Sequence, residues 1–434
     1  MHNAESLHIL WVAIALFSGL MFTRVFKKMH LNFPDVTAFL IAGIMIGPNV
    51  LGRLGIEGLG FNSYESVQSL KIISDAALGF IAFAIGSEFR MSELKHTGRV
   101  ATVIGIFQAV VASALVDVVL VILHFILGPE RLPLPVAITM GAIASATAPA
   151  ATLMVVRQYK ANGPLTKLLL PIVALDDAVG LVIFSVSLGV AQAFQGGNLN
   201  AISIIVNPLL EIVGSLILGS VMGWILTKLE RLFYSNSNRL SLTISFVLLT
   251  LALSTLEFEV GPVTISFSSL LVCMMLGTIF CNMSDFSEDI MKRAERWTAP
   301  LNACFFVLSG AELEIGVFSN WAFVLIGVVY IVARSAGKYY GARFSSQLTG
   351  CDHNVVKYLG ITLLPQAGVA LGMCSQASVL GAFPGSIIRN VTLFSVLIYE
   401  LVGPILTRNA LMAAGEIAPT PDSKKSHERF QAKA

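Results

Sequence analysis

Long apolar stretches separated by short polar segments recur along the whole chain. Windows long enough to cross about 30 Å of hydrocarbon cover residues 8–24, 35–52, 70–89, 100–127, 132–155, 165–193, 201–227, 240–257, 264–282, 299–318, 321–343, 355–380 and 385–411. Runs of this length with few charges are typical of membrane-spanning helices, whose backbone polar groups are all satisfied internally. The pattern therefore predicts an all-α polytopic membrane protein with 13 transmembrane helices.

The composition agrees with a membrane protein. Hydrophobic residues make up 55% of the 434 residues and charged residues 12%, whereas soluble domains carry about 25% charged residues. An ordinary soluble enzyme is excluded, and we expect a transporter surrounded by membrane lipid, with no nucleic-acid partner. The five cysteines form no CxxC pair, so neither a disulfide framework nor a zinc site is indicated, and no cofactor is expected.

The basic residues predict the orientation of the chain. Lys and Arg gather in the segments that follow the odd-numbered windows, and the opposite side holds Arg53, Lys71, Arg131 and Arg389. Because cytoplasmic loops are enriched in basic residues, we expect the N-terminus outside and the C-terminus in the cytoplasm, in a multi-pass protein of the cytoplasmic membrane. Residues 413–434 are polar and are expected to form a disordered cytoplasmic tail.

Two pairs of segments suggest an internal repeat. FLIAGIMIG (39–47) matches SLLVCMMLG (269–277), and FIAFAIGSE (80–88) matches CFFVLSGAE (304–312). The two pairs lie in consecutive windows, and the predicted orientation runs each copy opposite to its mate. Repeats of inverted topology are typical of secondary transporters, whose substrate site lies near mid-membrane.

Proline residues predict an interrupted helix in each half. Pro149 follows Ser145 and Thr147 in the fifth window, and Pro365 lies in the twelfth window, its mate in the repeat. A mid-membrane proline frees a carbonyl group that protein or cavity water must satisfy. We therefore expect two discontinuous helices that cross at Pro149 and Pro365.

Asp176 and Asp177 lie in the middle of the sixth window. An aspartate at a helix centre costs about 2.5–3.5 kcal/mol on insertion scales, so two adjacent aspartates are hard to explain as scaffold. One such carboxylate can hold either a proton or a hard cation such as Na⁺ but not both, and that competition suffices for exchange.

Two basic residues lie near the end of the eleventh window. Lys338, within Ser335-Ala-Gly-Lys338, has small neighbours that allow close helix packing, and it is a candidate ion-pair partner of Asp176 and second proton carrier; the alternative is a lysine that extends to the cytoplasmic interface. Arg334 is always charged and needs a partner. The candidate partners of Arg334 are three carboxylates, at Glu88, Glu312 and Glu400.

The chain resembles the monovalent cation:proton antiporter superfamily, specifically the bacterial sodium/proton antiporters, over about residues 8–411. The resemblance rests on IAGIMIGPNVLG (41–52), FAIGSEFRMSEL (83–94), SATAPAAT (145–152), LDDAVGLVIF (175–184), FFVLSGAEL (305–313), AGKYYGA (336–342) and LPQAGVALG (364–372). The Asp-Asp pair with the Gly-Lys of the later helix is its most specific part.

The resemblance implies a homodimer in which a core domain moves as an elevator against a fixed domain. It implies that 1–98 and 231–320 form the dimerisation domain, that 99–195 and 321–412 form the core transport domain, and that 196–230 is a linker helix.

The resemblance also implies functional residues. Asp177 matches the cation- and proton-binding aspartate, Asp176 its neighbour, Lys338 the lysine paired with Asp176, and Thr147 a polar ligand position. The transported Na⁺ would be held by Asp177 and Asp176. Ser145, Arg334 and Glu400 are expected in the surrounding network.

The Asp-Asp pair resembles the electrogenic branch of that superfamily, which exchanges more than one proton per sodium. Relatives that move potassium share most of the motifs, so K⁺/H⁺ antiport is an alternative to exchange of Na⁺ or Li⁺. A sodium-coupled carrier of an organic anion, and a cation channel or membrane-embedded sensor, are alternatives from other classes.

Overall fold

The computed structural model describes residues 2–29, 34–56, 59–87, 89, 91–195, 207–256, 258–260, 263–312 and 321–417. In the first half the helices are α1 (His2–Lys28), α2 (Asp35–Ile46), α3 (Tyr64–Gln68), α4 (Lys71–Ser87), α5 (Met91–Leu127), α6 (Leu134–Ile143), α7 (Pro149–Gln158), α8 (Pro164–Phe194) and α9 (Asn207–Glu230). In the second half they are α10 (Asn236–Ser254), α11 (Ser269–Met283), α12 (Ser287–Glu312), α13 (Trp321–Leu348), α14 (His353–Thr362), α15 (Gly368–Gln376) and α16 (Ala382–Ala413).

Two short 3-10 helices and a hairpin complete the described structure. The 3-10 helices are η1 (Gly52–Leu54) and η4 (Ala377–Leu380). Strands β1 (Phe258–Val260) and β2 (Val263–Ile265) pair antiparallel before α11. The apolar window 264–282 therefore begins in a strand, which hydropathy alone cannot separate from a helix.

Each of the 13 apolar windows contains a helix or a pair of helices in the described structure. Seven helices among the described residues are long and apolar enough to cross a membrane, so the chain is a multi-pass membrane protein, and the count of 13 crossings stays a prediction. The windows place some helix ends wrongly. Helix α12 begins at Ser287, twelve residues before its window, because basic residues of its first turns hide a continuous helix from hydropathy.

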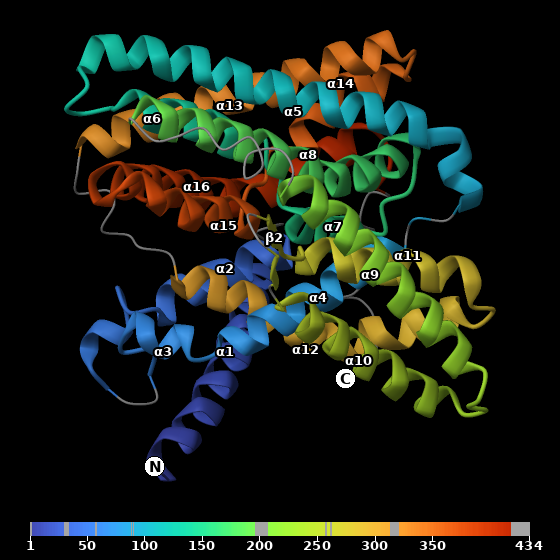
Figure 1. The fold of residues 1–434 in the computed structure, drawn as a ribbon. Helices are drawn as coiled ribbons and strands as arrows, with labels where there is room; N and C mark the ends of the chain where they lie inside the picture. The colour runs from blue at the N-terminus through green and yellow to red at the C-terminus, as the bar shows by residue number, and fades with distance from the viewer. Residues whose placement is uncertain are drawn as a thin grey trace.

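The helices pack in two groups (Figure 1). Helices α1, α2, α4, α10, α11 and α12 contact one another, and helices α5–α8 contact α13–α16. The partners repeat between the halves of the chain: α2 packs on α12 as α11 packs on α4, and α5 packs on α8 as α13 packs on α16. Figure 1 shows the second group above the first, with α15 and α16 facing α2 and α12.

Glycines set the close helix crossings in the first group. A Cβ on Gly310 of α12 would lie 2.2 Å from the carbonyl oxygen of Leu40 in α2. In the other crossing, a Cβ on Gly277 of α11 would lie 2.1 Å from the carbonyl oxygen of Phe83 in α4. Because both contacts are with backbone, no side-chain movement could make room for a larger residue. All four residues lie in the segments that define the sequence repeat.

The C-terminal end of the described chain caps helix α8. The carboxylate of Glu416 accepts hydrogen bonds from the backbone N–H of Leu165, at 2.6 Å, and from the N–H and hydroxyl of Thr166, at 2.8 and 2.6 Å. These are first-turn N–H groups that have no partner within their own helix, and a negative charge there is favoured by the helix dipole. Glu416 thereby connects the end of α16 to the beginning of α8.

Candidate functional site

Two interrupted helices meet in the middle of the second helix group. Helix α6 ends at Ile143 and α7 begins at Pro149, while α14 ends at Thr362 and α15 begins at Gly368. The two breaks touch, since the N–H of Ala148 donates to the carbonyl of Pro365 at 2.8 Å. Proline at position 149 suits the first position of a helix, where its missing N–H costs no bond. The residues between the helices leave carbonyl groups without helical partners.

Arg334 satisfies three of these carbonyls. Its Nε donates to Ala144 at 3.0 Å, one terminal nitrogen donates to Leu364 at 2.7 Å, and the other donates to Ala146 at 2.6 Å. The side chain is fully buried, and its guanidinium lies 4.5 Å from the ring centroid of Tyr399. The fork of a guanidinium can bond several acceptors at once. Arg334 therefore joins the two breaks and brings a permanent positive charge beside them.

This arrangement corrects the expectation of a carboxylate partner for Arg334. Among the described residues its partners are backbone carbonyls, and neither Glu312 nor Glu400 bonds to it; Glu88 lies outside the described residues. Sequence reasoning matched charge with charge, but broken helices also supply carbonyl dipoles that stabilise a cation.

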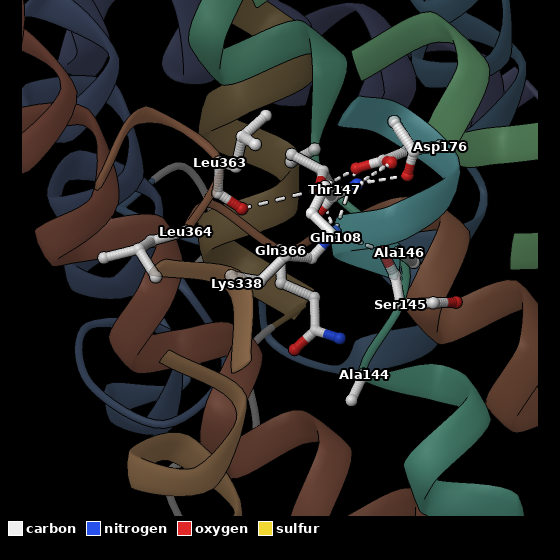
Figure 2. Close-up of polar contacts among 12 residues, drawn as sticks. Gln108, Ala144, Ser145, Ala146, Thr147, Asp176, Lys338, Leu363, Leu364 and Gln366 are labelled. Atoms are coloured by element: carbon white, nitrogen blue, oxygen red, sulfur yellow. Dashed lines mark hydrogen bonds and ion pairs between the residues drawn. The ribbon is translucent and has the colours of Figure 1, made fainter. Parts of the chain in front are cut away.

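Lys338 lies one helical turn after Arg334 and enters the same site (Figure 2). Its ammonium donates to the carbonyl of Ser145, to the hydroxyl of Thr147 at 2.9 Å, and to the carboxylate of Asp176 at 2.9 Å. Its side chain is 0% exposed, which excludes a lysine extended to the interface. Small residues permit this position: a Cβ on Gly337 would lie 2.6 Å from the Cα of Ala112 in α5.

Asp176 of α8 lies at the centre of the hydrogen-bonded cluster and is fully buried. One carboxylate oxygen accepts from Lys338 and from the hydroxyl of Thr147, at 2.6 Å, and the other accepts from the side-chain amide of Gln108 in α5. Figure 2 shows these side chains converging from α5, α8, α13 and the first break. Burying two charges is tolerated where they pair and their remaining groups are bonded, which is the case here.

The other predicted residues lie at different distances from this cluster. Ser145 contributes its carbonyl, while its hydroxyl donates to Ala142 at 2.7 Å. Pro149 and Pro365 lie at the two breaks. Glu400 is buried on α16 but makes none of the cluster's hydrogen bonds. Asp177 follows Asp176 in α8, and its side chain lies outside the described residues.

Two glutamines were missed by sequence reasoning. Gln108 bonds Asp176, and the amide of Gln366 donates to the carbonyl of Ile143 at 2.9 Å and to Tyr330 at 3.0 Å. Gln366 thus satisfies another carbonyl at the end of α6. The available signal was a buried amide: both glutamines interrupt strongly apolar runs, where a polar side chain requires a partner.

The cluster gathers oxygen ligands around a single positive charge. The Lys338 ammonium is surrounded by a carbonyl, a hydroxyl and a carboxylate oxygen, which are the types of ligand that hard cations prefer. Among the described residues no group of three or more His, Cys, Asp or Glu side chains could hold a metal ion.

Comparisons with known proteins give consistent relatives. A family model described as the transmembrane sodium/hydrogen exchanger matches residues 12–413. The Na⁺/H⁺ antiporter NhaS4 of Synechocystis sp. is 23% identical over 414 residues, which cover 92% of this chain and 95% of that protein. The K⁺ efflux antiporter 5 of Arabidopsis thaliana is 34% identical over 125 residues, covering 27% of this chain and 20% of that protein.

A solved structure shares the fold. The sodium proton antiporter MjNhaP1 of Methanocaldococcus jannaschii aligns with a TM-score of 0.69 at 18% identity, covering 94% of this chain and 98% of that chain.

Proposed function

The chain belongs to the transmembrane sodium/hydrogen exchanger family and is a cation/proton antiporter rather than an enzyme; on that premise we propose that it exchanges Na⁺ or Li⁺ for protons, and that the carboxylates of Asp176 and Asp177 bind the cation and the protons in turn. K⁺ is the alternative cation, since one relative is a K⁺ efflux antiporter.

The observation that carries this proposal is the oxygen cage around the Lys338 ammonium. A Na⁺ ion needs the same carbonyl, hydroxyl and carboxylate oxygens that now accept from the ammonium. Cation and ammonium therefore compete for one set of ligands, and an arriving Na⁺ displaces Lys338 from Asp176. A buried ammonium without its partner is costly, so the displaced lysine releases its proton.

This competition supports electrogenic exchange. If Lys338 loses one proton and the aspartate pair loses another for each Na⁺ bound, two protons cross the membrane in one direction for each Na⁺ that crosses in the other, and net charge is moved. Arg334 remains charged throughout because its guanidinium does not deprotonate in proteins. It keeps the two breaks together while the pair of Lys338 and Asp176 opens and closes.

The movement that carries the ion is proposed to be an elevator. Residues 99–195 and 321–412, which contain both breaks and the cluster, are the moving core. Residues 1–98 and 231–320 are the fixed, dimer-forming domain, and 196–230 is the linker. The support is the division of helix contacts into two groups and their repeated partners, which also favours an inverted repeat. The charge pattern favours a cytoplasmic C-terminus.

Proteoliposomes with an interior pH dye test the exchange. After a pH gradient is imposed, adding Na⁺ or Li⁺ should dissipate it for the wild type, and Asp177→Asn and Asp176→Asn should each abolish the response. The exposed Asp289→Asn is the matched control and should respond as wild type. An unchanged response in both central variants would refute the proposal. An ion series that includes K⁺ identifies the cation.

A further inference from the structure

A large cavity lies between the two helix groups, away from the cluster around Asp176. Its volume is about 1300 Å³, which is room for about forty water molecules at roughly 30 Å³ each. Helices α4 and α12 form one wall, and α15 and α16 form the other. Lys71 and Arg389, at its rim, lie on the side that the charge pattern predicts to be external.

Acidic side chains lie at increasing depth in this cavity. Asp75 at the rim is exposed, Glu312 of α12 is half-buried, and Glu400 of α16 is 6% exposed. Glu312 and Glu400 come from different helix groups and line the same cavity. Neutral oxygen groups of Ser309 and Asn390 line the same cavity.

Glu400 lacks the partner that its burial requires. Its Oε2 atom is buried and has no hydrogen-bond partner among the described residues. A buried carboxylate without a partner costs several kcal/mol. A group with this environment needs a cation or a proton, and intramembrane carboxylates that face a water-filled cavity commonly mark ion pathways.

We propose that Glu400 and Glu312 form a second monovalent-cation site, at the base of the cavity between the two helix groups. The inference rests on the proposed function, because the site would supply cations to the cluster. The two sites are neighbours along α16: Gly403, one turn after Glu400, lies against the second break, where a Cβ on Gly403 would be 3.0 Å from Pro365 Cγ. An ion bound between the two helix groups would also stabilise the arrangement in which both groups line this cavity.

Direct binding of ²²Na⁺ to purified protein on scintillation beads tests this site. In an Asp176→Asn/Asp177→Asn background the central carboxylates are removed, and we expect one ²²Na⁺ bound per chain at saturation. Adding Glu400→Gln, which keeps the side-chain shape, should abolish that binding. Adding Glu65→Gln, an exposed acid on α3 outside the cavity lining, should leave it unchanged. Equal binding with and without Glu400→Gln, or no binding in the background protein, overturns the proposal.

A second measurement avoids the double variant if it does not fold. In the wild-type background, Glu400→Gln and Glu312→Gln should each raise the Na⁺ concentration for half-maximal exchange about tenfold when Na⁺ is added on the cavity side, with the maximal rate kept. If the Na⁺ concentration for half-maximal exchange in these variants stays within twofold of the wild-type value, the proposed site is excluded. If wild type shows no exchange, the proposed antiport fails, and the binding assay still decides the second site.

Discussion

Replacing Arg334 by lysine should destabilise the protein although the charge is kept. The guanidinium makes three hydrogen bonds that join the two breaks, and an ammonium at the shorter side chain can keep one at best. Two lost bonds from a charged donor are worth about 1.5–3 kcal/mol each in soluble proteins, whereas interhelical bonds in membranes reach at most about 1.7 kcal/mol. The membrane value governs here, and because such bonds average about 0.6 kcal/mol, we expect a loss of about 1–3 kcal/mol for two bonds.

Equilibrium unfolding by SDS in mixed micelles, followed by tryptophan fluorescence, measures this free energy. The matched control is Arg343→Lys on the exposed face of the same helix, where one hydrogen bond to Tyr339 is at 3.3 Å; surface changes of this kind stay within about 0.5 kcal/mol. If the free energy of unfolding of Arg334→Lys lies within 1 kcal/mol of the wild-type value, or is no lower than that of Arg343→Lys, then the guanidinium does not hold the breaks together.

Three further outcomes follow from the same contacts. Lys338→Gln should keep Na⁺/H⁺ exchange but remove its dependence on membrane potential, measured with only Na⁺ or Li⁺ as substrate and with or without a K⁺/valinomycin clamp; retained voltage dependence contradicts a proton-carrying lysine. Thr147→Val removes the 2.6 Å hydrogen bond to Asp176, which is worth about 1.4 kcal/mol, or a tenfold change in affinity. The Na⁺ concentration for half-maximal exchange should therefore rise about tenfold. If that concentration is unchanged, the hydroxyl is excluded as a ligand. Gly310→Ala should lower the SDS unfolding free energy by about 3 kcal/mol through overpacking, whereas Gly372→Ala, with nothing within 4 Å, should not; equal values for the two would show that the backbone shifts freely.

Hydropathy was sufficient to locate the helices because the bilayer imposes length and apolarity on each of them. It could not find the strands at 258–265, which are too short to show periodicity. It also could not extend α12 over Lys292 and Arg293, because a helix leaving the apolar layer no longer has to be apolar. Pro149 begins α7, and Pro365 lies between the end of α14 and the beginning of α15; the missing N–H of a proline acts within its own turn.

The central charged residues stood out because Asp176 and Lys338 are costly in an apolar run. The geometry now joins them at 2.9 Å. The contributions of Ala144, Leu364 and Ala146 were invisible because they come from carbonyl groups, which every residue has. Only the fold decides which carbonyls are released from helices, and that is why the carbonyl partners of Arg334 could not be predicted.

The Glu416 cap gives the C-terminal end a direct mechanical connection to the aspartate helix. Its bonds to Leu165 and Thr166 hold the first turn of α8, and the same helix continues past Pro171 to Asp176. A fluorophore or spin label attached just after residue 417 would therefore report the position of the helix that contains Asp176.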